Sequence, residues 1–162
     1  MSVLYILCGI PGSGKSTWAQ KIVNEHGEDK VAWISRDKIR FALIKSDEEY
    51  FSHETEVINN FILQIQKAID DNTPFVIADA THLNRKSRAQ LINHLDLHNS
   101  EICYVYFDIP LNIALERNAQ RQGRAKVPDL VIEKMYYSLT KPTRNVIVID
   151  ENGNEKIKEV AG

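Results

Sequence analysis

Residues 9–17 read GIPGSGKST and directly follow VLYILC, a run of apolar and β-branched residues that is typical of a short buried strand. The nonapeptide meets the pattern G-x-x-x-x-G-K-[ST] with Gly9, Gly14, Lys15 and Ser16. Glycines have no Cβ, so such a loop can adopt positive φ angles and bring its backbone N–H groups close to a polyphosphate. The stretch therefore predicts a phosphate-binding loop between a strand and a helix.

The side chains of the loop predict which cofactors it holds. Lys15 supplies a point charge for the β- and γ-phosphates, and the Ser16 hydroxyl is a suitable ligand for Mg²⁺. The helix that follows adds the positive end of its dipole. We therefore predict ATP and Mg²⁺ as cofactors. The nucleotide contacts are expected from Gly12, Ser13, Gly14, Lys15, Ser16 and Thr17.

Size and composition favour one globular domain over residues 1–162. With 162 residues and 43% hydrophobic content, the chain can bury about 68–70% of its unfolded surface. No apolar run approaches the ~20 residues of a membrane-spanning helix, so we expect no membrane contact. Cys8 and Cys103 fall in predicted strands without disulfide or zinc spacing, which favours a cytoplasmic location.

Apolar runs at regular intervals predict the order of secondary structure. The strands are expected at residues 3–8, 31–35, 75–79, 102–108 and 146–150, with helical patterns between them. Ser46 with Glu49 resembles a capping box for the longest helix, and Asn152-Gly153 predicts a turn before an edge strand at 156–160. Alternating helices and near-continuous apolar strands predict a three-layer α/β fold with a five-stranded, mainly parallel sheet.

Polar residues follow several of these strands. In a parallel sheet with right-handed crossovers, the carboxyl ends of the strands meet at one edge, where ligands bind. We therefore expect Gly9, the tripeptide Ser35-Arg36-Asp37, Asp79 and Asp108 to converge.

Two carboxylates at this edge have predicted roles in phosphoryl transfer. Asp79 ends the strand FVIAD in the position of a Walker B residue that holds Mg²⁺, and no Glu follows it, which argues against simple ATP hydrolysis. Asp37 can accept the proton of an attacking hydroxyl, and Arg40 lies on the same helical face. The alternatives are a strand-end cap for Asp79, and an ordinary helix N-cap with a surface arginine for Asp37 and Arg40.

The net charge of −2 excludes a generally basic nucleic-acid binder, but the charges are unevenly placed. We interpret the acidic run at residues 47–56 as the solvated start of a helix. A basic run covers residues 117–126, where Arg117 and Arg121 are four apart near a helix end. This run predicts a lid at about 117–128 whose arginines act on a transferring phosphoryl group, the alternative being a basic helix end that compensates the dipole.

Several segments in this order resemble the phage-type 5′-polynucleotide kinase family. They are GIPGSGKSTWAQ for the phosphate loop, SRDKIR for an R-D-x-x-R acceptor motif, DATHLNRKSR after the Walker B aspartate, and FDIP, ERNAQR and KVPDLVIEKMYYSL for the lid region. The similarity covers about residues 4–140. It implies a P-loop kinase fold and transfer of the ATP γ-phosphate to the 5′-hydroxyl end of DNA or RNA as the partner substrate.

The resemblance also implies roles for individual residues. The aspartate matching Asp37 is the general base that activates the 5′-hydroxyl, and the arginine matching Arg40 contacts the acceptor phosphate beside it. Lys15 and Ser16 serve the ATP phosphates and Mg²⁺. The 3′-phosphatase motif D-x-D-x-T that accompanies some family members is absent, so the resemblance implies a kinase domain only.

In the lid, the resemblance implies that arginines matching Arg117 and Arg121 clamp the donor. The spacer at residues 122–126 is one residue longer than the family's pattern, so Arg124 is an alternative to Arg121 as the second lid contact.

Two other functions are compatible with the residues. One is a P-loop kinase of a small alcohol such as a sugar acid, a nucleoside or an antibiotic. The other is a nucleotide-dependent switch or scaffold, which is disfavoured because no N-K-x-D guanine-reading motif is present. The sequence leaves open the preference between DNA and RNA, the end structure, the oligomeric state and the pathway.

Overall fold

The computed structural model describes residues 1–45 and 49–156, and of Arg124 only the main chain. Its centre is a sheet in the order β2-β3-β1-β4-β5, in which every pairing between neighbouring strands is parallel. The strands are β1 (Val3–Cys8), β2 (Val31–Ser35), β3 (Phe75–Asp79), β4 (Glu101–Phe107) and β5 (Val146–Ile149). All five lie within one residue of their predicted bounds, which confirms the α/β prediction.

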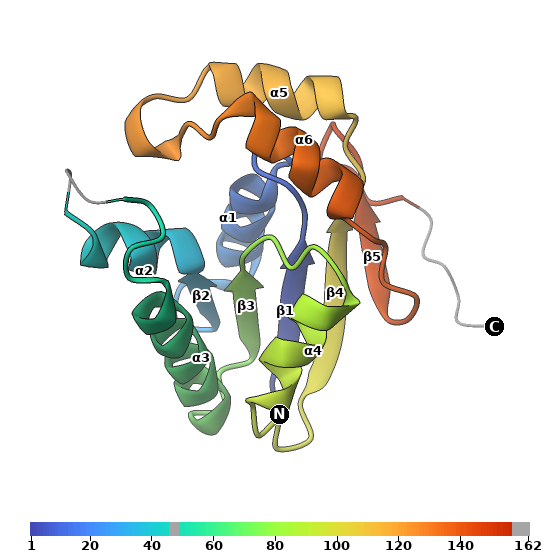
Figure 1. The fold of residues 1–162 in the computed structure, drawn as a ribbon. Coiled ribbons are helices and arrows are strands. Elements are labelled where there is room, and N and C mark those ends of the chain that lie inside the picture. Colours follow the sequence, from blue (N-terminus) through green and yellow to red (C-terminus); the bar gives the residue numbers. More distant parts are fainter. Residues whose placement is uncertain (46–48, 157–162) are drawn as a thin grey trace.

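The helices cover both faces of the sheet and its carboxyl-terminal edge. They are α1 (Lys15–His26), α2 (Arg36–Leu43), α3 (Glu54–Asp70), α4 (Arg85–Asn93), α5 (Leu111–Ala119) and α6 (Asp129–Ser138), with a 3₁₀ turn η1 (Gly123–Ala125). In Figure 1, α3 and α4 lie in front of the sheet, α1 lies behind it, and α5 and α6 cross its upper edge. Within the described residues, no helix is long and apolar enough to cross a membrane.

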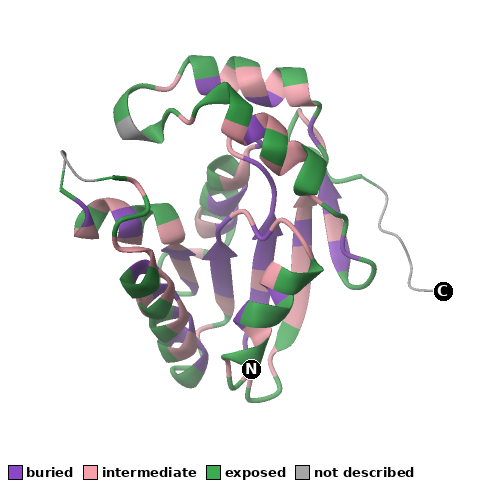
Figure 2. Ribbon diagram, viewed as in Figure 1, coloured by how far each residue is buried: buried purple, intermediate pink, exposed green. Residues whose placement is uncertain are grey.

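The alternation of side chains along β1 builds a core on each face of the sheet. Leu4 and Ile6 are fully buried and pack in one cluster with Phe61 of α3. Leu7 belongs to the opposite cluster, with Trp18 of α1. Figure 2 shows the central strands as the most buried part of the molecule. Each such side chain contributes about 1.5–3 kcal/mol when it is buried, so β1 fixes both layers around the residues that lead into the phosphate loop.

A third, smaller cluster fastens the upper helices to the phosphate loop. Ile10 of the loop packs with Ala114 of α5 and Ile132 of α6, and all three side chains are fully buried or nearly so. The helices on either side of the predicted lid, residues 117–128, are therefore anchored on the phosphate loop.

The start of α3 differs from the sequence prediction. Ser46, the predicted N-cap, lies outside the described residues, and Glu49 precedes the helix without belonging to it. The helix begins at Glu54, later than predicted. Glu54 forms an ion pair with Arg40 of α2, so a tertiary contact accompanies the first turn, which local capping chemistry alone does not predict.

The predicted turn at Asn152-Gly153 is confirmed. The Gly153 N–H donates to the Asp150 carbonyl at 3.0 Å, and Glu155 forms an antiparallel bridge with Ile149. The rest of the predicted edge strand, residues 157–160, lies outside the described part of the chain.

Within the described residues, neither Cys8 nor Cys103 forms a disulfide. Burial raises the pKa of the Cys8 thiol to about 11, so Cys8 behaves as a small apolar residue of β1.

Candidate active site

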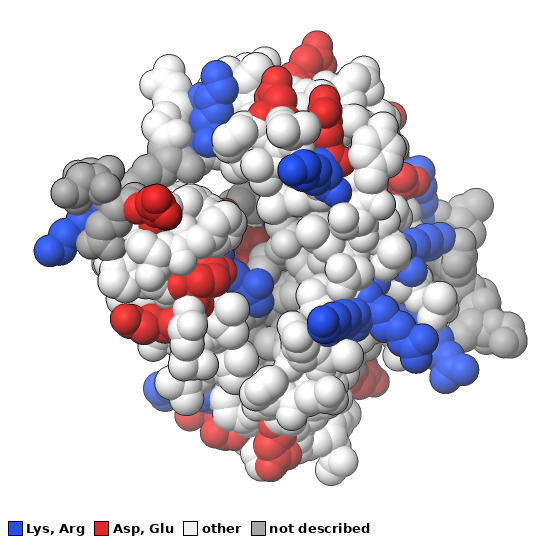
Figure 3. Space-filling model, in the orientation of Figure 1, with Lys and Arg blue, Asp and Glu red and all other residues white. Residues whose placement is uncertain are grey.

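One cleft of about 950 Å³ opens at the carboxyl-terminal edge of the sheet. The phosphate loop, α5 and α6 form one wall, and α2 with the turn before α3 forms the other. Figure 3 shows this face hollowed between the two walls. Most of the predicted site residues line this cleft, namely Gly12, Ser13, Gly14, Lys15, Ser16, Thr17, Asp37, Arg40, Asp79, Arg117 and Arg121. The side chain of Arg124 lies outside the described part of the structure.

The backbone of the phosphate loop requires its glycines. Gly12 and Gly14 have φ angles of +81° and +99°. A Cβ at Gly12 would lie 2.6 Å from the carbonyl oxygen of Ala114 in α5. Gly14 is the N-cap of α1 and provides no side-chain cap, so the N–H groups of the first turn are left for another acceptor. This arrangement fits the phosphates of a nucleotide.

Lys15 is folded back over the loop. Its Nζ donates to the carbonyl oxygens of Gly9 and Ile10, each at 3.0 Å. Burial lowers the pKa of Lys15, and the nearby carboxylate of Asp79 opposes this shift. A desolvated ammonium group in this position is well suited to a phosphate oxygen, because an opposite charge favours its charged form.

Asp79 is held by a residue that the sequence analysis did not single out. Its Oδ2 accepts a hydrogen bond from Trp33 Nε1 of β2 at 2.9 Å, and β2 and β3 are in register at Ser35 and Asp79. Burial raises the pKa of Asp79, while Lys15 and then Trp33 oppose the shift. The sequence pattern predicts Trp33 only as part of a strand, and the one signal of its role is that a buried indole N–H usually needs an acceptor.

The two predicted Mg²⁺ ligands, Ser16 and Asp79, both line the cleft and offer it oxygen atoms. Asp79 is 7% exposed, and within the described residues its Oδ1 accepts no hydrogen bond. Elsewhere in the described chain, no group of three or more His, Cys, Asp or Glu side chains could hold a metal ion. These two oxygens fit Mg²⁺, which binds through few protein ligands together with substrate phosphates and water.

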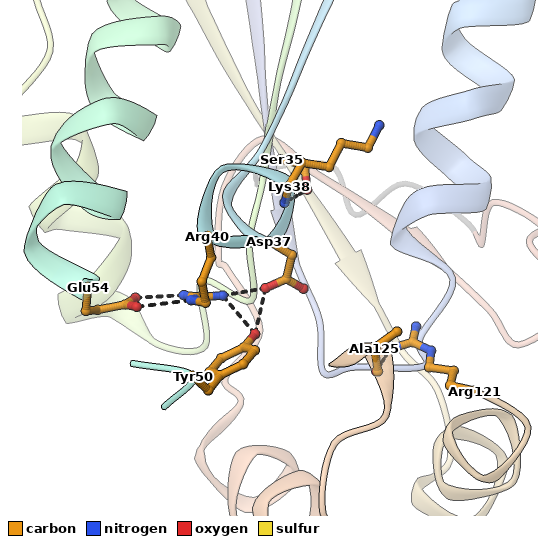
Figure 4. Close-up of polar contacts among 8 residues, drawn as sticks. All are labelled: Ser35, Asp37, Lys38, Arg40, Tyr50, Glu54, Arg121 and Ala125. Carbon is orange, nitrogen blue, oxygen red and sulfur yellow. Dashed lines mark hydrogen bonds and ion pairs between the residues drawn. The ribbon is translucent and has the colours of Figure 1, made fainter. Parts of the chain in front are cut away.

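Asp37 lies within a network of side chains at the other wall. Its Oδ1 accepts hydrogen bonds from Arg40 Nη1 and from Tyr50 Oη, the latter at 2.7 Å. Arg40 Nε and Nη2 donate to the two carboxylate oxygens of Glu54 at 3.0 and 2.7 Å, which makes this pair bidentate. Figure 4 shows Arg40 between Glu54 and Asp37, with Arg121 on the opposite side of the cleft. Both hydrogen bonds that the network makes to Asp37 therefore end on the same carboxylate oxygen, Oδ1.

Tyr50 and Glu54 are the site residues that sequence reasoning missed. Glu54 was assigned to a solvated acidic run, but its side chain is 29% exposed and paired with Arg40, whereas Glu56 in the same run is 64% exposed. Burial and the hydrogen bond to Asp37 raise the pKa of Tyr50, so its hydroxyl stays a donor. Neither residue has a spacing to Arg40 that a helix or strand period would reveal.

The two lid arginines differ in their surroundings. Arg117 Nη1 donates to the Gly12 carbonyl at 3.2 Å, and its Nη2 donates to the carbonyl of Glu151 after β5. Arg121 makes one long contact, from Nη1 to the Ala125 carbonyl of η1 at 3.4 Å, and its hydrogen bond is exposed. Arg117 therefore braces the phosphate loop against the sheet, and Arg121 keeps donors available in the cleft.

Asp108 does not join the site. It follows β4 at the expected edge, but it forms an ion pair with Lys156 Nζ at 2.6 Å and is not among the residues that line the cleft. The end of β4 lies at the predicted edge of the sheet, but the Asp108 side chain pairs with Lys156 instead of facing the cleft.

A phosphate loop after the first strand of a 2-3-1-4-5 parallel sheet, with ionisable side chains facing it across one cleft, is the arrangement of a P-loop kinase. The chain belongs to the AAA domain family, whose profile matches residues 4–142. Membership of this P-loop kinase family implies ATP binding and an ATP-dependent phosphotransferase.

The known proteins similar to this chain include a tRNA kinase, a putative polynucleotide kinase and a chain of an RNA repair complex, and the fold is also that of a sugar kinase and a gluconokinase of solved structure. It is 31% identical to an L-seryl-tRNA(Sec) kinase of Methanococcus maripaludis, over 86% of this chain and 53% of that protein. It is 27% identical to a putative bifunctional polynucleotide kinase/RNA ligase of Autographa californica nuclear polyhedrosis virus, over 85% of this chain and 21% of that protein. A chain of the solved Pnkp1/Rnl/Hen1 RNA repair complex matches with a TM-score of 0.72 and 25% identity, over 85% of this chain and 44% of that one. The chain thus spans about half the length, or less, of these proteins.

Proposed function

We propose that this protein transfers the γ-phosphate of ATP to the 5′-hydroxyl end of a polynucleotide, with Asp37 as the general base. The observation that carries the proposal is the position of Asp37 in the same cleft as the phosphate loop, in the wall opposite it. Among the described residues, Arg40 and Tyr50 engage its Oδ1, and its Oδ2 accepts no hydrogen bond. Its Oδ2 is therefore available to accept a proton from an incoming hydroxyl.

The reaction follows from this arrangement. The acceptor hydroxyl lies between Asp37 and the γ-phosphate and transfers its proton to Asp37 Oδ2. A bond forms between the acceptor oxygen and the γ-phosphorus, the bond from that phosphorus to the β-γ bridging oxygen breaks, and ADP leaves. A loose phosphoryl-transfer transition state needs positioning and charge stabilisation more than a strong base, so an ordinary carboxylate suffices.

The other cleft residues would supply this charge stabilisation. Lys15 and the N–H groups at the start of α1 would hold the β- and γ-phosphates. Mg²⁺ would be held by Ser16 and Asp79, and it would neutralise charge that develops on the phosphate oxygens. Arg121 would approach the transferred group from the lid, a contribution that reaches about 10³–10⁵ in rate in other P-loop enzymes.

The likeness to a putative polynucleotide kinase and to a chain of an RNA repair complex supports a 5′-hydroxyl acceptor. A second candidate is transfer to another alcohol, favoured by the 31% identity with the L-seryl-tRNA(Sec) kinase. In that case the hydroxyl of an aminoacyl group, or of a small molecule, would occupy the same position beside Asp37.

Labelled ATP distinguishes these acceptors directly. The protein would be incubated with matched 5′-hydroxyl DNA and RNA strands, with seryl-tRNA, and with a panel of sugar acids, nucleosides and antibiotics in a coupled ADP assay. We expect label on the 5′ end of an oligonucleotide. Label only on seryl-tRNA or on a small alcohol would overturn the proposal.

The variant Asp37→Asn tests the proposed base. It should lower kcat by about 10²–10⁴-fold, the usual contribution of a general base, while ATP affinity stays within about twofold. The matched control is Asp71→Asn, which removes an exposed carboxylate that pairs with Lys67 outside the cleft. An Asp37→Asn enzyme with unimpaired transfer would exclude Asp37 as the base.

A further inference from the structure

Two segments beside the cleft carry cations and no acids. Residues 80–95 follow β3 and include α4, and residues 134–149 run from the middle of α6 to the end of β5. Asp and Glu make up 22 of the 162 residues, so about four acids would be expected in the two segments by chance. Instead, their charged residues are Arg85, Lys86, Arg88, Lys134, Lys141 and Arg144.

Hydrogen bonds join the two segments. The Thr140 N–H donates to the Leu83 carbonyl at 2.8 Å, and Arg88 Nη2 donates to the carbonyls of Leu83 and Thr140. Arg88 is 5% exposed, and within the described residues its other partners are the His82 carbonyl and the Thr140 hydroxyl, so no carboxylate compensates its charge. An arginine remains charged in proteins, and this junction therefore holds a positive charge beneath its surface.

Four exposed side chains surround the junction, and we refer to them as the basic surface. They are Arg85 and Lys86 at the start of α4, and Lys141 and Arg144 between α6 and β5. Within the described residues, Arg85, Lys86 and Arg144 form no ion pair. Exposed cations without acidic partners are suited to a polyanion, because each phosphate that they neutralise releases a counterion.

The basic surface lies on one side of the cleft only. Figure 3 shows Lys and Arg side chains gathered over the start of α4 and the segment that leads into β5, whereas Asp and Glu side chains lie over α3 on the other side of the hollow. Glu49 and Glu56 are among the exposed acids before and within α3. A phosphodiester chain that leaves the cleft would be repelled on the side of α3 and attracted on the side of α4.

The distance between the cleft and the basic surface is short. Thr81 lines the cleft and lies four residues before Arg85. Four residues span at most about 14 Å, which is the length of about four nucleotides in a stacked strand at ~3.4 Å each. An acceptor longer than this can occupy the cleft and the basic surface at the same time.

We propose that the backbone of the acceptor polynucleotide leaves the cleft across the basic surface, which binds it from about the fourth nucleotide onward. The inference rests on the proposed function, since it assumes a polynucleotide acceptor. The cleft holds the reacting end, and the basic surface adds affinity that depends on the length of the strand. A chain with a net charge of −2 can bind a polyanion in this way because its cations are segregated to one side of the site.

A series of acceptor lengths separates the basic surface from the reacting end. The probes are 5′-hydroxyl oligonucleotides from a dinucleotide to a 12-mer with a fluorophore at the 3′ end, titrated into the full chain saturated with ADP. We expect the affinity to rise with length and to level off at about 8 nucleotides. The logarithmic salt dependence should be steeper for the 12-mer than for the dinucleotide by about two, since three phosphate contacts to a single strand contribute ~0.7 each.

The test variant removes three cations of the basic surface, Arg85→Gln, Lys86→Gln and Arg144→Gln. It should weaken binding of the 12-mer by about 10- to 100-fold at low salt, and it should shrink the advantage of the 12-mer over the dinucleotide by the same factor. The matched control changes the net charge equally through three exposed lysines on α1, before β2 and on α3, namely Lys21→Gln, Lys30→Gln and Lys67→Gln. It should keep the length dependence of the wild type.

The same charges can be removed from the ligand, which avoids any effect of the variant on folding. A 12-mer with uncharged methylphosphonates beyond the fourth nucleotide should bind wild-type protein like a tetranucleotide, and the test variant should barely distinguish it from the normal 12-mer. Equal affinity of the dinucleotide and the 12-mer, or equal losses in the test and control variants, would overturn the basic surface alone. If no oligonucleotide receives label from ATP, the proposed function itself fails.

Discussion

The two walls of the cleft are built in different ways. The nucleotide wall, which contains the phosphate loop, is shaped mainly by backbone groups. It has two glycines at positive φ, a helix start without a side-chain cap, and main-chain carbonyls that accept hydrogen bonds from Lys15. The acceptor wall, which is formed by α2 and the turn before α3, depends instead on hydrogen bonds between side chains. The network of Asp37, Arg40, Tyr50 and Glu54 joins α2 to the start of α3. The phosphate loop of the first wall is one contiguous segment, whereas the network of the second wall is assembled from α2, the turn at Tyr50 and the start of α3. Substitutions in the first wall should therefore lower ATP affinity, whereas substitutions in the second should lower kcat and stability.

Of the substitutions that compare the two walls in ATP binding, the largest effect is expected at Gly12. Gly12→Ala would place a Cβ 2.6 Å from the Ala114 carbonyl at a φ of +81°. Backbone strain of about 1–3 kcal/mol, together with displacement of the loop, should lower ATP affinity by about 100-fold and transfer with it. The measurement is ATP titration by calorimetry, followed by the transfer assay.

Gly153→Ala is the matched control. Gly153 has a φ of +77°, but a Cβ there would meet no atom within 4 Å. It should cost stability without changing ATP affinity. If Gly12→Ala binds ATP as well as Gly153→Ala does, the nucleotide wall does not depend on its backbone shape.

A smaller effect, confined to the acceptor wall, is expected at Glu54. Glu54→Gln removes the charge that faces Arg40, and leaves a guanidinium only 6% exposed without full compensation. We expect the free energy of unfolding to fall by about 1–3 kcal/mol and kcat to fall about tenfold, with ATP affinity within twofold of wild type. Denaturant unfolding and steady-state kinetics measure the two effects.

Glu56→Gln, on the same helix, removes a carboxylate that is 64% exposed and should change neither quantity. Equal loss of ATP affinity and of kcat in Glu54→Gln would mean that the two walls are coupled, against the comparison drawn above.

The smallest effect at neutral pH is expected at His82, which is buried and is not among the residues that line the cleft. Its Nδ1 contacts the Leu7 carbonyl of β1 at 2.7 Å, so Nδ1 carries the proton and the buried Nε2 has no partner. Burial, and then the charge of Arg36, lower the pKa of His82 to about 3. The unfolded chain binds this proton below about pH 6.5 and the folded chain does not, so stability is complete above that pH and is lost as the pH falls toward 3.

His82→Asn should remove this acid-side loss, about 1.4 kcal/mol per pH unit, and leave transfer at neutral pH unchanged. Asparagine tolerates the φ of +40° at this position. Denaturant unfolding at pH 7, 5.5 and 4 is the measurement. In His98→Asn, where φ is +48° and the side chain is half exposed, the acid-side loss should persist. An unchanged pH slope in His82→Asn would contradict the assignment.

Much of the fold follows from local patterns in the sequence. The strands came out within one residue of their predicted bounds, because apolar runs bounded by turn residues have few alternatives. The start of α3 was placed too early, because the capping signal around Ser46 is local, whereas the ion pair of Glu54 with Arg40 is tertiary. Trp33 was missed because its partner Asp79 is 46 residues away and on another strand.

The sequence by itself determined the nucleotide wall, since a glycine-rich turn between a strand and a helix encodes its geometry within nine consecutive residues. It also placed Asp37 and Asp79 at the sheet edge through the parallel topology. Only the tertiary structure decided which of the two arginines of α2 is hydrogen-bonded to other side chains and which, among the described residues, is not. Arg36 and Arg40 have the same chemistry four residues apart, and their difference arises from Glu54 and Tyr50, which the chain brings back from beyond the next turn.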